Sequence, residues 1–324
     1  MKILGISAFY HDSAAAIVVN NEIIAAAQEE RFSRKKHDNN FPEEAIKYCL
    51  KEAGLKLSDL DAIAFYDKPL LKFERLLETY YAFAPKGFFS FLKAMPSWMQ
   101  EKFFFKKLIN GHLKKIGTWD KSKTKLLFPE HHLSHAASAF YPSNFEDAAI
   151  LTIDGVGEWS TASICYGNKN TIELKKEMHF PHSVGLLYSA FTYYCGFKVN
   201  SGEYKLMGLA PYGNKNDAQT IEFIRLIKEE VCTIFSDGSV FLNQKFFQYA
   251  IGNVMTNNKF WEELFGISPR VDDENEITLD YCNLALAIQL VTTEIVIKLA
   301  THTKEILNTT NLCLAGGVAL NCVI

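Results

Sequence analysis

The stretch AAILTIDGVGE, residues 148–158, opens a pattern of three strands that the chain contains twice. Its β-branched run leads into a glycine-rich turn, and two further strand-like runs follow before a segment of helical periodicity. The predicted strands are 148–153, 160–166 and 171–177 in this copy and 3–9, 14–19 and 22–28 in the other; the helices that follow are 185–195 and 42–53. Two similar units of three strands and one helix predict an α/β fold of duplicated lobes.

The first turn of each unit carries side chains that are capable of chemistry. His11 and Asp12 lie in one turn, and Asp154 and Glu158 lie in the other. Short apolar strands with glycine turns are common, so the repeat alone could be a coincidence, but the matching position of the polar turns argues against this. Turns that face each other across a cleft can hold a nucleotide phosphate between them.

Two histidines at helical spacing indicate a metal site. Imidazoles four residues apart share one face of a helix, so His131 and His135 could bind one divalent ion with Asp154 as an oxygen ligand. A helix can also place two histidines at this spacing only to cap, to pack or to face water. Asp154 stands at a strand end before Gly155 and Gly157, where phosphates and their metals commonly bind, and this favours the metal site.

Two glycine-containing segments suit a nucleotide. Residues 202–213 hold three glycines and a proline around Lys205, which predicts a loop where backbone approaches a ligand and an ammonium meets an anion, although such loops also serve as connectors. Residues 312–321 read as a buried strand that ends in Gly316 and Gly317 and opens a helix. Backbone amides at that helix terminus could bind a nucleotide, or the glycines could simply allow tight packing.

The remaining long segments have less specific patterns. Residues 73–115 are rich in Phe, Tyr and Lys and predict an aromatic helical insertion that packs on its own lobe, with an interfacial amphipathic segment as the alternative. Residues 270–276 predict a solvated loop before a helix at 279–307. That helix contains a glutamine, a glutamate and a lysine within its apolar run, which would be costly in lipid, so we expect a core helix.

Composition and charge narrow the classes of function. The 324 residues are 48% hydrophobic and 22% charged with a formal net charge of −3, which gives no sequence-wide attraction to nucleic acid. Seven scattered cysteines without a CxxC spacing are typical of a reducing compartment. The first residues show no signal-peptide pattern. These features predict a cytoplasmic protein with a small-molecule partner, and neither a nucleic-acid nor a membrane partner.

Six stretches together resemble the O-carbamoyltransferase family of nodulation protein U and the cephalosporin carbamoyltransferase. They are FYHDSAA (9–15), EERFSR (29–34), HHLSH (131–135), Asp154-Gly155, residues 202–213 and GGVALN (316–321), and they occur in family order along essentially the whole chain. The resemblance implies ribonuclease-H-like lobes of the actin, sugar-kinase and heat-shock ATPase superfamily. It implies a first lobe at 1–140 with the insertion at about 73–115, and a second lobe at 141–324 that is incomplete at its C-terminus.

The activity implied by this resemblance is ATP- and metal-dependent carbamoyl transfer. In the family, a YrdC-like domain makes carbamoyl-adenylate from carbamoyl phosphate and ATP, and the sugar-kinase-like domain transfers the carbamoyl group to a hydroxyl of a sugar or antibiotic-like small molecule. The YrdC-like domain and a further acidic metal ligand are expected beyond Ile324. The alternatives are a kinase or ATPase of the same superfamily and a nucleotide-binding scaffold. A homodimer is compatible with the sequence, which leaves the oligomeric state open.

The resemblance also assigns roles to single residues. His131, His135 and Asp154 match metal ligands, with His132 as the alternate ligand; iron is the expected metal, and zinc and manganese are the other candidates. His11 is the candidate general base for the acceptor hydroxyl, or else a turn residue that only forms local hydrogen bonds.

The remaining assigned residues contact ligands. Those expected to bind substrate are Asp12, Arg31 and Lys36, although a solvated surface is an alternative for the two basic side chains. Those expected to bind the nucleotide are Gly155, Gly157, Glu158, Lys205, Gly316, Gly317 and Asn321.

Overall fold

The computed structural model describes residues 1–271 and 276–324. Its backbone forms an α/β structure of two compact units, each with its own sheet. Unit 1 comprises Met1–Glu74 and Leu92–Ser134, and unit 2 comprises Arg75–Phe91 and His135–Ile324. Each unit is described by itself.

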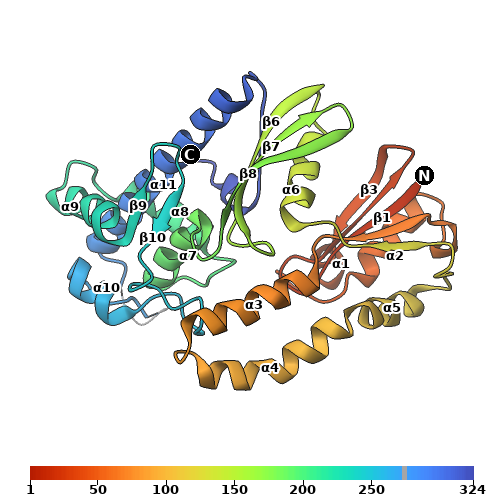
Figure 1. The fold of residues 1–324 in the computed structure, drawn as a ribbon, viewed down its shortest axis with the longest axis horizontal. Helices are drawn as coiled ribbons and strands as arrows, with labels where there is room; N and C mark the ends of the chain where they lie inside the picture. The colour runs from red at the N-terminus through yellow and green to blue at the C-terminus, as the bar shows by residue number, and fades with distance from the viewer. Residues whose placement is uncertain (272–275) are drawn as a thin grey trace. The chain divides into compact units, whose positions relative to one another are not determined.

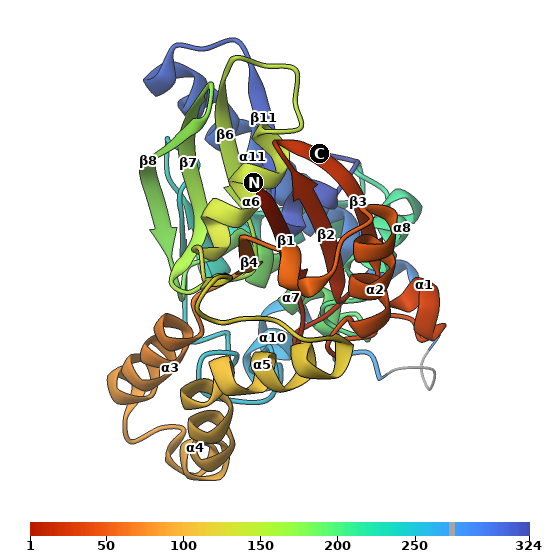
Figure 2. The same cartoon turned by 90° about the vertical axis from the view of Figure 1, so that its right-hand side faces the viewer.

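The sheet of unit 1 begins with the predicted antiparallel meander. Its strands are β1 (Lys2–Ser7), β2 (Ala14–Val19), β3 (Glu22–Gln28), β4 (Ala62–Phe65) and β5 (Lys125–Leu127). They lie in the order β3-β2-β1-β4-β5, with β4 parallel to β1 and β5 parallel to β4 (Figure 2). Asn20 and Asn21 both adopt positive φ, which suits the tight turn between β2 and β3.

A buried glutamate fixes the first helices of unit 1 against this sheet. Glu29 stands between β3 and the short helix α1 (Glu30–Ser33), and its carboxylate accepts the backbone N–H groups of Glu44 (3.2 Å) and Ala45 (2.8 Å). Those donors lie in the first turn of α2 (Glu43–Glu52), where N–H groups have no partner within the helix and a negative charge is favourable. The apolar face of α2 is thereby held on the core of unit 1. A 3₁₀ turn, η1 (Leu57–Asp59), leads into β4.

The sheet of unit 2 repeats the arrangement of unit 1. It contains β6 (Asp147–Ile153), β7 (Ser160–Asn168), β8 (Thr171–His179) and β11 (Leu312–Ala315). Strands β6, β7 and β8 form an antiparallel meander, and β11 pairs in parallel with β6 on its other side (Figure 2). Strands β1, β2, β3 and β4 of unit 1 have the same order and directions. The prediction of a duplicated α/β fold is therefore confirmed.

Some helices of unit 2 contact this second sheet directly, and others pack on those helices. They are α7 (Val184–Tyr194), α8 (Glu203–Leu209), α9 (Ala218–Leu226), α10 (Asn258–Phe265) and α11 (Leu279–Leu307), with the π-helical turn η3 (Ile227–Val231) and the small β9 (Cys232–Ile234) and β10 (Val240–Leu242) hairpin. Long α11 contacts α7, α8 and α9 (Figure 1). Trp261 of α10 is fully buried against Phe191 and Tyr194 of α7, which joins the outer helix to the core.

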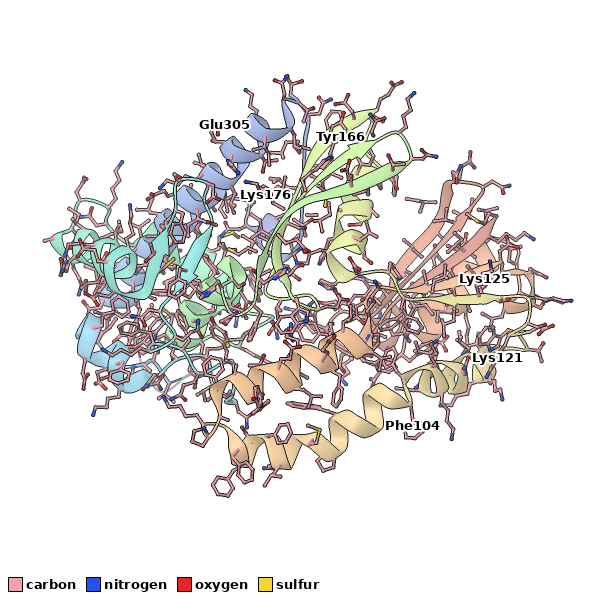
Figure 3. All side chains as sticks on the ribbon, in the orientation of Figure 1. Phe104, Lys121, Lys125, Tyr166, Lys176 and Glu305 are labelled. Atoms are coloured by element: carbon pink, nitrogen blue, oxygen red, sulfur yellow. The ribbon has the colours of Figure 1, made fainter. Side chains whose placement is uncertain are left out.

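Helix α11 has the packing of a core helix. By length and apolar composition it could also cross a membrane, and it is the one helix among residues 1–271 and 276–324 that meets both conditions. Its side chains are buried along much of its length in the core of unit 2, Leu284, Ile288 and Val291 among them. The helix also contacts strand β8, where Lys176 Nζ lies 2.9 Å from His302 Nε2 of α11 (Figure 3 labels Lys176).

The predicted insertion is helical. It forms α3 (Pro69–Phe83), α4 (Phe88–Phe103) and α5 (Phe105–Ile116). Helix α5 buries Phe105, Ile109 and Leu113 in the core of unit 1, whereas Arg75–Phe91 groups with unit 2. Phe104, at the junction of α4 and α5, is exposed (Figure 3). Packing on its own lobe therefore describes α5 and not the whole insertion.

One loop predicted from the sequence is a helix in the structure, and another cannot be compared with it. The prediction of a loop over residues 202–213 is wrong, because α8 is followed directly by the 3₁₀ turn η2 (Ala210–Tyr212); Leu206 and Leu209 bury one face of this segment, and burial outweighs the glycine content. After β11 the chain forms a 3₁₀ turn, η4 (Gly317–Leu320). The loop expected at 270–276 lies largely outside the described residues.

Candidate functional site

The histidine pair lies on one helix, as predicted. Helix α6 (His131–Phe140) is continuous across the division between the units, which falls after Ser134. His131 and His135 are therefore one turn apart on a single rigid element. Within unit 2, His135 Nε2 lies 3.6 Å from Asp154 Oδ2. One ligand atom from each of His131, His135 and Asp154 lies within 4.8 Å of the other two, and all three residues are partly buried.

Asp154 is held at the end of β6 by backbone on several sides. Its N–H donates to Thr161 O (2.9 Å), which continues the β6–β7 ladder by one bond. Its Oδ1 accepts the N–H of Gly317 at 3.2 Å. The hydroxyl of Ser183 donates to Asp154 O (3.1 Å) and Gly155 O (2.7 Å). The main chain of Asp154 is thus held in place, and the Gly317 N–H holds Oδ1 of its carboxylate. The other oxygen, Oδ2, is the one directed toward His135.

The N-terminus of α7 lies directly against the Asp154 turn. Ser183 is its N-cap, and its hydroxyl accepts the Leu186 N–H at 3.0 Å. A Cβ on Gly185 would meet Asp154 O at 2.6 Å and Gly155 N at 2.7 Å, so only glycine fits there. The predicted nucleotide residue Gly155 therefore lies at a helix N-terminus, a position that favours anions.

Gly316 and Gly317 approach the same turn from the end of β11, the strand that pairs with β6. Gly316 follows β11 with φ of +88°, and a Cβ there would lie 2.4 Å from Ile153 O. A Cβ on Gly317 would lie 3.0 Å from Asp154 Oδ1. Gly316 is thus required by its contact with the backbone of β6, and Gly317 lies close to the Asp154 carboxylate, which supports the tight-packing alternative.

Asn321 has an internal partner. Its Nδ2 donates to Gln289 Oε1 (3.0 Å) and its Oδ1 accepts from Gln289 Nε2 (3.2 Å). Burial raises the pKa of the Tyr188 phenol, so its hydroxyl stays protonated and donates to the same Gln289 oxygen at 2.9 Å. The Asn321 amide serves first to anchor the segment after η4 to α11.

Gly157 and Glu158 complete the turn after Asp154, and both are buried. The N–H of Gly157 donates to Ser160 O (2.9 Å), and its carbonyl accepts Arg75 Nη1 (2.7 Å). The guanidinium of Arg75 also lies over the Phe180 ring, 5.2 Å from its centroid. Arg75 had no distinguishing sequence pattern, because its partner is a backbone carbonyl far away in the chain.

In unit 1, the turn after β1 forms a carboxylate bridge between two imidazoles. Asp12 Oδ2 lies 3.1 Å from His11 Nδ1, and Asp12 Oδ1 lies 2.9 Å from His37 Nδ1. Glu30 accepts the backbone N–H of His37 at 3.0 Å. Ligand atoms of Asp12, Glu30 and His37 also lie within 4.8 Å of one another, so they form a second group with metal-like spacing.

Sequence reasoning missed His37 as the partner of Asp12 and Glu30 as the partner of His37. The backbone at Asp12, Arg34 and His37 adopts positive φ, and these bends bring distant residues together. Non-glycine residues rarely adopt this conformation, so no sequence pattern indicates it. The only available signal was the density of His, Asp and Glu in residues 29–38.

The other predicted ligand residues lie at the surface or are buried. Arg31 is exposed and pairs with the adjacent Glu30 at 3.4 Å. Lys36 and Lys205 are exposed, and His132, the alternate metal ligand, is buried on α6. The roles proposed for these residues stay predictions, as does the expectation that the two first turns face each other.

A family model decides the relationship of this chain. The model described as carbamoyltransferase N-terminus matches residues 2–324. The chain belongs to this carbamoyltransferase family.

Relatives agree with this assignment. An uncharacterized protein of Synechocystis is 55% identical over 322 residues, which cover 99% of this chain and 51% of the relative. Nodulation protein NolNO of Sinorhizobium fredii is 32% identical over 325 residues, covering 98% of this chain and 42% of the relative. The chain therefore spans about half the length of the curated relatives it matches.

Solved structures resemble it only weakly. YeaZ from Pseudomonas aeruginosa aligns with a TM-score of 0.29 at 13% identity, over 54% of this chain and 64% of that one. The ROK hexokinase from Thermus thermophilus aligns with a TM-score of 0.32 at 14% identity, over 99% and 83%. The fold class therefore rests on the strand order of the two sheets.

The glycine at 316 provides a test of the geometry at Asp154. We expect Gly316→Ala to destabilise the protein by about 2–4 kcal/mol, because a methyl group would require both a left-handed backbone and a shift of Ile153. Gly208→Ala is the matched control: it lies in α8 with nothing within 4 Å of its added Cβ, and should stabilise by about 0.5–1 kcal/mol. Urea unfolding followed by tryptophan fluorescence measures both; equal effects would contradict the close approach.

Proposed function

We propose that this chain is the transferase domain of an O-carbamoyltransferase. It would move a carbamoyl group from carbamoyl-adenylate, derived from carbamoyl phosphate and ATP, to a hydroxyl of a sugar or antibiotic-like small molecule. The observation that carries the proposal is the group of His131, His135 and Asp154, in a chain of the carbamoyltransferase family.

The donor set of this group fits a divalent metal. Two imidazoles from one helix and one carboxylate suit iron, zinc or manganese better than magnesium, which prefers oxygen ligands. The spacing of the ligand atoms allows one ion to be shared. Iron is the metal we expect. A bound ion would supply Lewis-acid stabilisation of negative charge on the carbamoyl and phosphate oxygens.

His11 has the surroundings of a general base. A carboxylate only accepts hydrogen bonds, so Asp12 holds the neutral His11 imidazole with its proton on Nδ1. Nε2 is then the basic nitrogen, and Asp12 supports the positive charge that develops there, as the aspartate of a catalytic triad does. His37 fixes the other oxygen of Asp12. His11 is half exposed, so an acceptor hydroxyl can reach it.

The proposed reaction balances as follows. The acceptor oxygen forms a bond to the carbamoyl carbon, and its proton passes to His11 Nε2. The bond between the carbamoyl carbon and the adenylate phosphate oxygen breaks, and AMP leaves with the electron pair. The turn of Asp154, Gly155, Gly157 and Glu158, next to Gly316 and Gly317, would hold the adenylate phosphate near the N-terminus of α7. Lys205 and Asn321 would extend this nucleotide site.

Two other functions give different products. A kinase or ATPase of the same superfamily would release ADP rather than AMP, and would require magnesium. A nucleotide-binding scaffold would bind nucleotide without turnover. The histidine pair favours the carbamoyltransferase, because neither alternative needs imidazole ligands.

Metal analysis tests the proposed centre. Purified wild-type chain should hold close to one equivalent of iron or another first-row metal, and His131→Ala and His135→Ala should each lose most of it, since each removes one of three protein ligands. His179→Ala, on an exposed imidazole at the end of β8, is the control and should retain the metal. Inductively coupled plasma mass spectrometry measures the content. Wild-type protein that still contains no metal after incubation with Fe²⁺, Zn²⁺ or Mn²⁺ would refute the proposed metal centre.

AMP release from supplied carbamoyl-adenylate tests the base. His11→Ala should slow hydroxyl-dependent AMP release by about 10²–10⁴-fold, the usual contribution of general-base catalysis. Asp12→Asn should also slow it, because the imidazole loses its carboxylate partner. His179→Ala should match wild type. Chromatographic quantification of AMP in this assay, and of ADP in a parallel assay supplied with ATP and Mg²⁺, separates the three functions. An unchanged rate of AMP release in His11→Ala would remove this residue from the base role.

A further inference from the structure

We propose that Lys72 is a positioning residue for the site described above. Its ammonium holds Tyr10 beside His11 and Tyr66 against His131, so one partly buried charge sets the orientation of two imidazoles. The inference rests on the proposed function for the roles of those imidazoles. All residues involved belong to unit 1.

Lys72 forms an ion pair of low exposure. Its Nζ is hydrogen-bonded to Oδ2 of Asp67, whose side chain is only 5% exposed, while that of Lys72 is 18% exposed. Asp67 follows β4, and Lys72 lies in the first turn of α3. Removing two charges from water is costly, and such a pair is often no more stable than apolar side chains of similar size. A role in specifying geometry is therefore a reasonable explanation for it.

The same ammonium lies within cation–π range of two tyrosine rings. Nζ is 5.8 Å from the centroid of Tyr10 and 5.3 Å from that of Tyr66, and the attraction operates within about 6 Å. Tyr10 belongs to the turn after β1, and Tyr66 follows β4. One cation thus fixes rings from two separate segments of unit 1.

Each of these rings contacts an imidazole of the proposed site. The centroids of Tyr10 and His11 are 4.8 Å apart. Tyr66 meets His131 edge to face, with centroids 5.5 Å apart and planes at 64°. The backbone of Tyr66 is also attached to α6, because its carbonyl accepts the Ser134 hydroxyl at 3.0 Å. A shift of the Tyr66 ring would therefore change the surroundings of His131 directly.

The nearby Lys68 shows a contrasting arrangement. It pairs with Glu130 at 2.6 Å, but both side chains are well exposed, 38% and 50%. Exposed pairs of this kind contribute little. The ion pair of Lys72 is thus less exposed than that of the other lysine of the same segment.

Imidazole signals in the metal-free protein test the inference without requiring metal or activity. With ¹³C-labelled histidine Cε1, Lys72→Met should shift or broaden the His11 and His131 signals, because the rings beside them lose their cation. The signals of His179 and His302 in unit 2 should stay in place. Lys72→Arg keeps a cation, so its His11 and His131 signals should lie close to those of wild type. Lys47→Met, at an exposed pair with Glu44 on α2, is the matched control.

A second variant guards against misfolding. Lys72→Met leaves the Asp67 carboxylate buried and unpaired, whereas Asp67→Asn combined with Lys72→Met removes both charges. The double variant should show the same shifts at His11 and His131. Unchanged His11 and His131 signals in the folded double variant would overturn the inference.

Metal binding provides a further measurement. Supporting residues around metal ligands commonly change affinity 10–100-fold, so we expect the Kd for Co²⁺ to rise by about that factor in the double variant. Wild type that binds no Co²⁺ would contradict the proposed function, while the imidazole signals would still decide the role of Lys72. A double variant that binds Co²⁺ with wild-type affinity would overturn the role of Lys72 in positioning His131.

Discussion

The close approach of three backbone segments at the end of β6 determines the candidate site. The carbonyl of Ile153 occupies the space where a Cβ of Gly316 would stand, and the carbonyl of Asp154 does the same at Gly185. The parallel strand β11 and the N-terminus of α7 therefore lie directly against the Asp154 turn. This contact leaves the aspartate backbone little freedom, and its carboxylate is placed before any ligand binds. Preorganised groups of this kind are the usual basis of metal and phosphate sites.

The sequence predicted the parts of the fold that depend on local patterns. The strand triplets, α2 and α7 follow from apolar runs, turn residues and helical periodicity, and they occur close to the predicted residues. The helical spacing of His131 and His135 follows from the geometry of a single helix. The pairing of Asp154 with His135 joins residues of separate elements, and the sequence indicated it only because both stood in recognisable motifs.

Other features could not be predicted, for identifiable physical reasons. Residues 202–209 contain two glycines, yet the burial of Leu206 and Leu209 favours helix α8. The bridge from Asp12 to His37 depends on left-handed backbone at both residues. Arg75 and Lys72 recognise a carbonyl and two aromatic rings, and neither partner has a sequence signature. Tertiary contacts, rather than local preferences, determine each of these.

Two groups of metal-like spacing occur in the described part of the chain, and we assign them different roles. Asp12, Glu30 and His37 are already joined by hydrogen bonds, whereas His131, His135 and Asp154 are the proposed metal ligands. Anomalous diffraction from crystals of the chain loaded with Co²⁺ distinguishes them. We expect a single strong peak within bonding distance of imidazole nitrogens of His131 and His135 and an oxygen of Asp154. A peak at Asp12, Glu30 and His37 alone would contradict it.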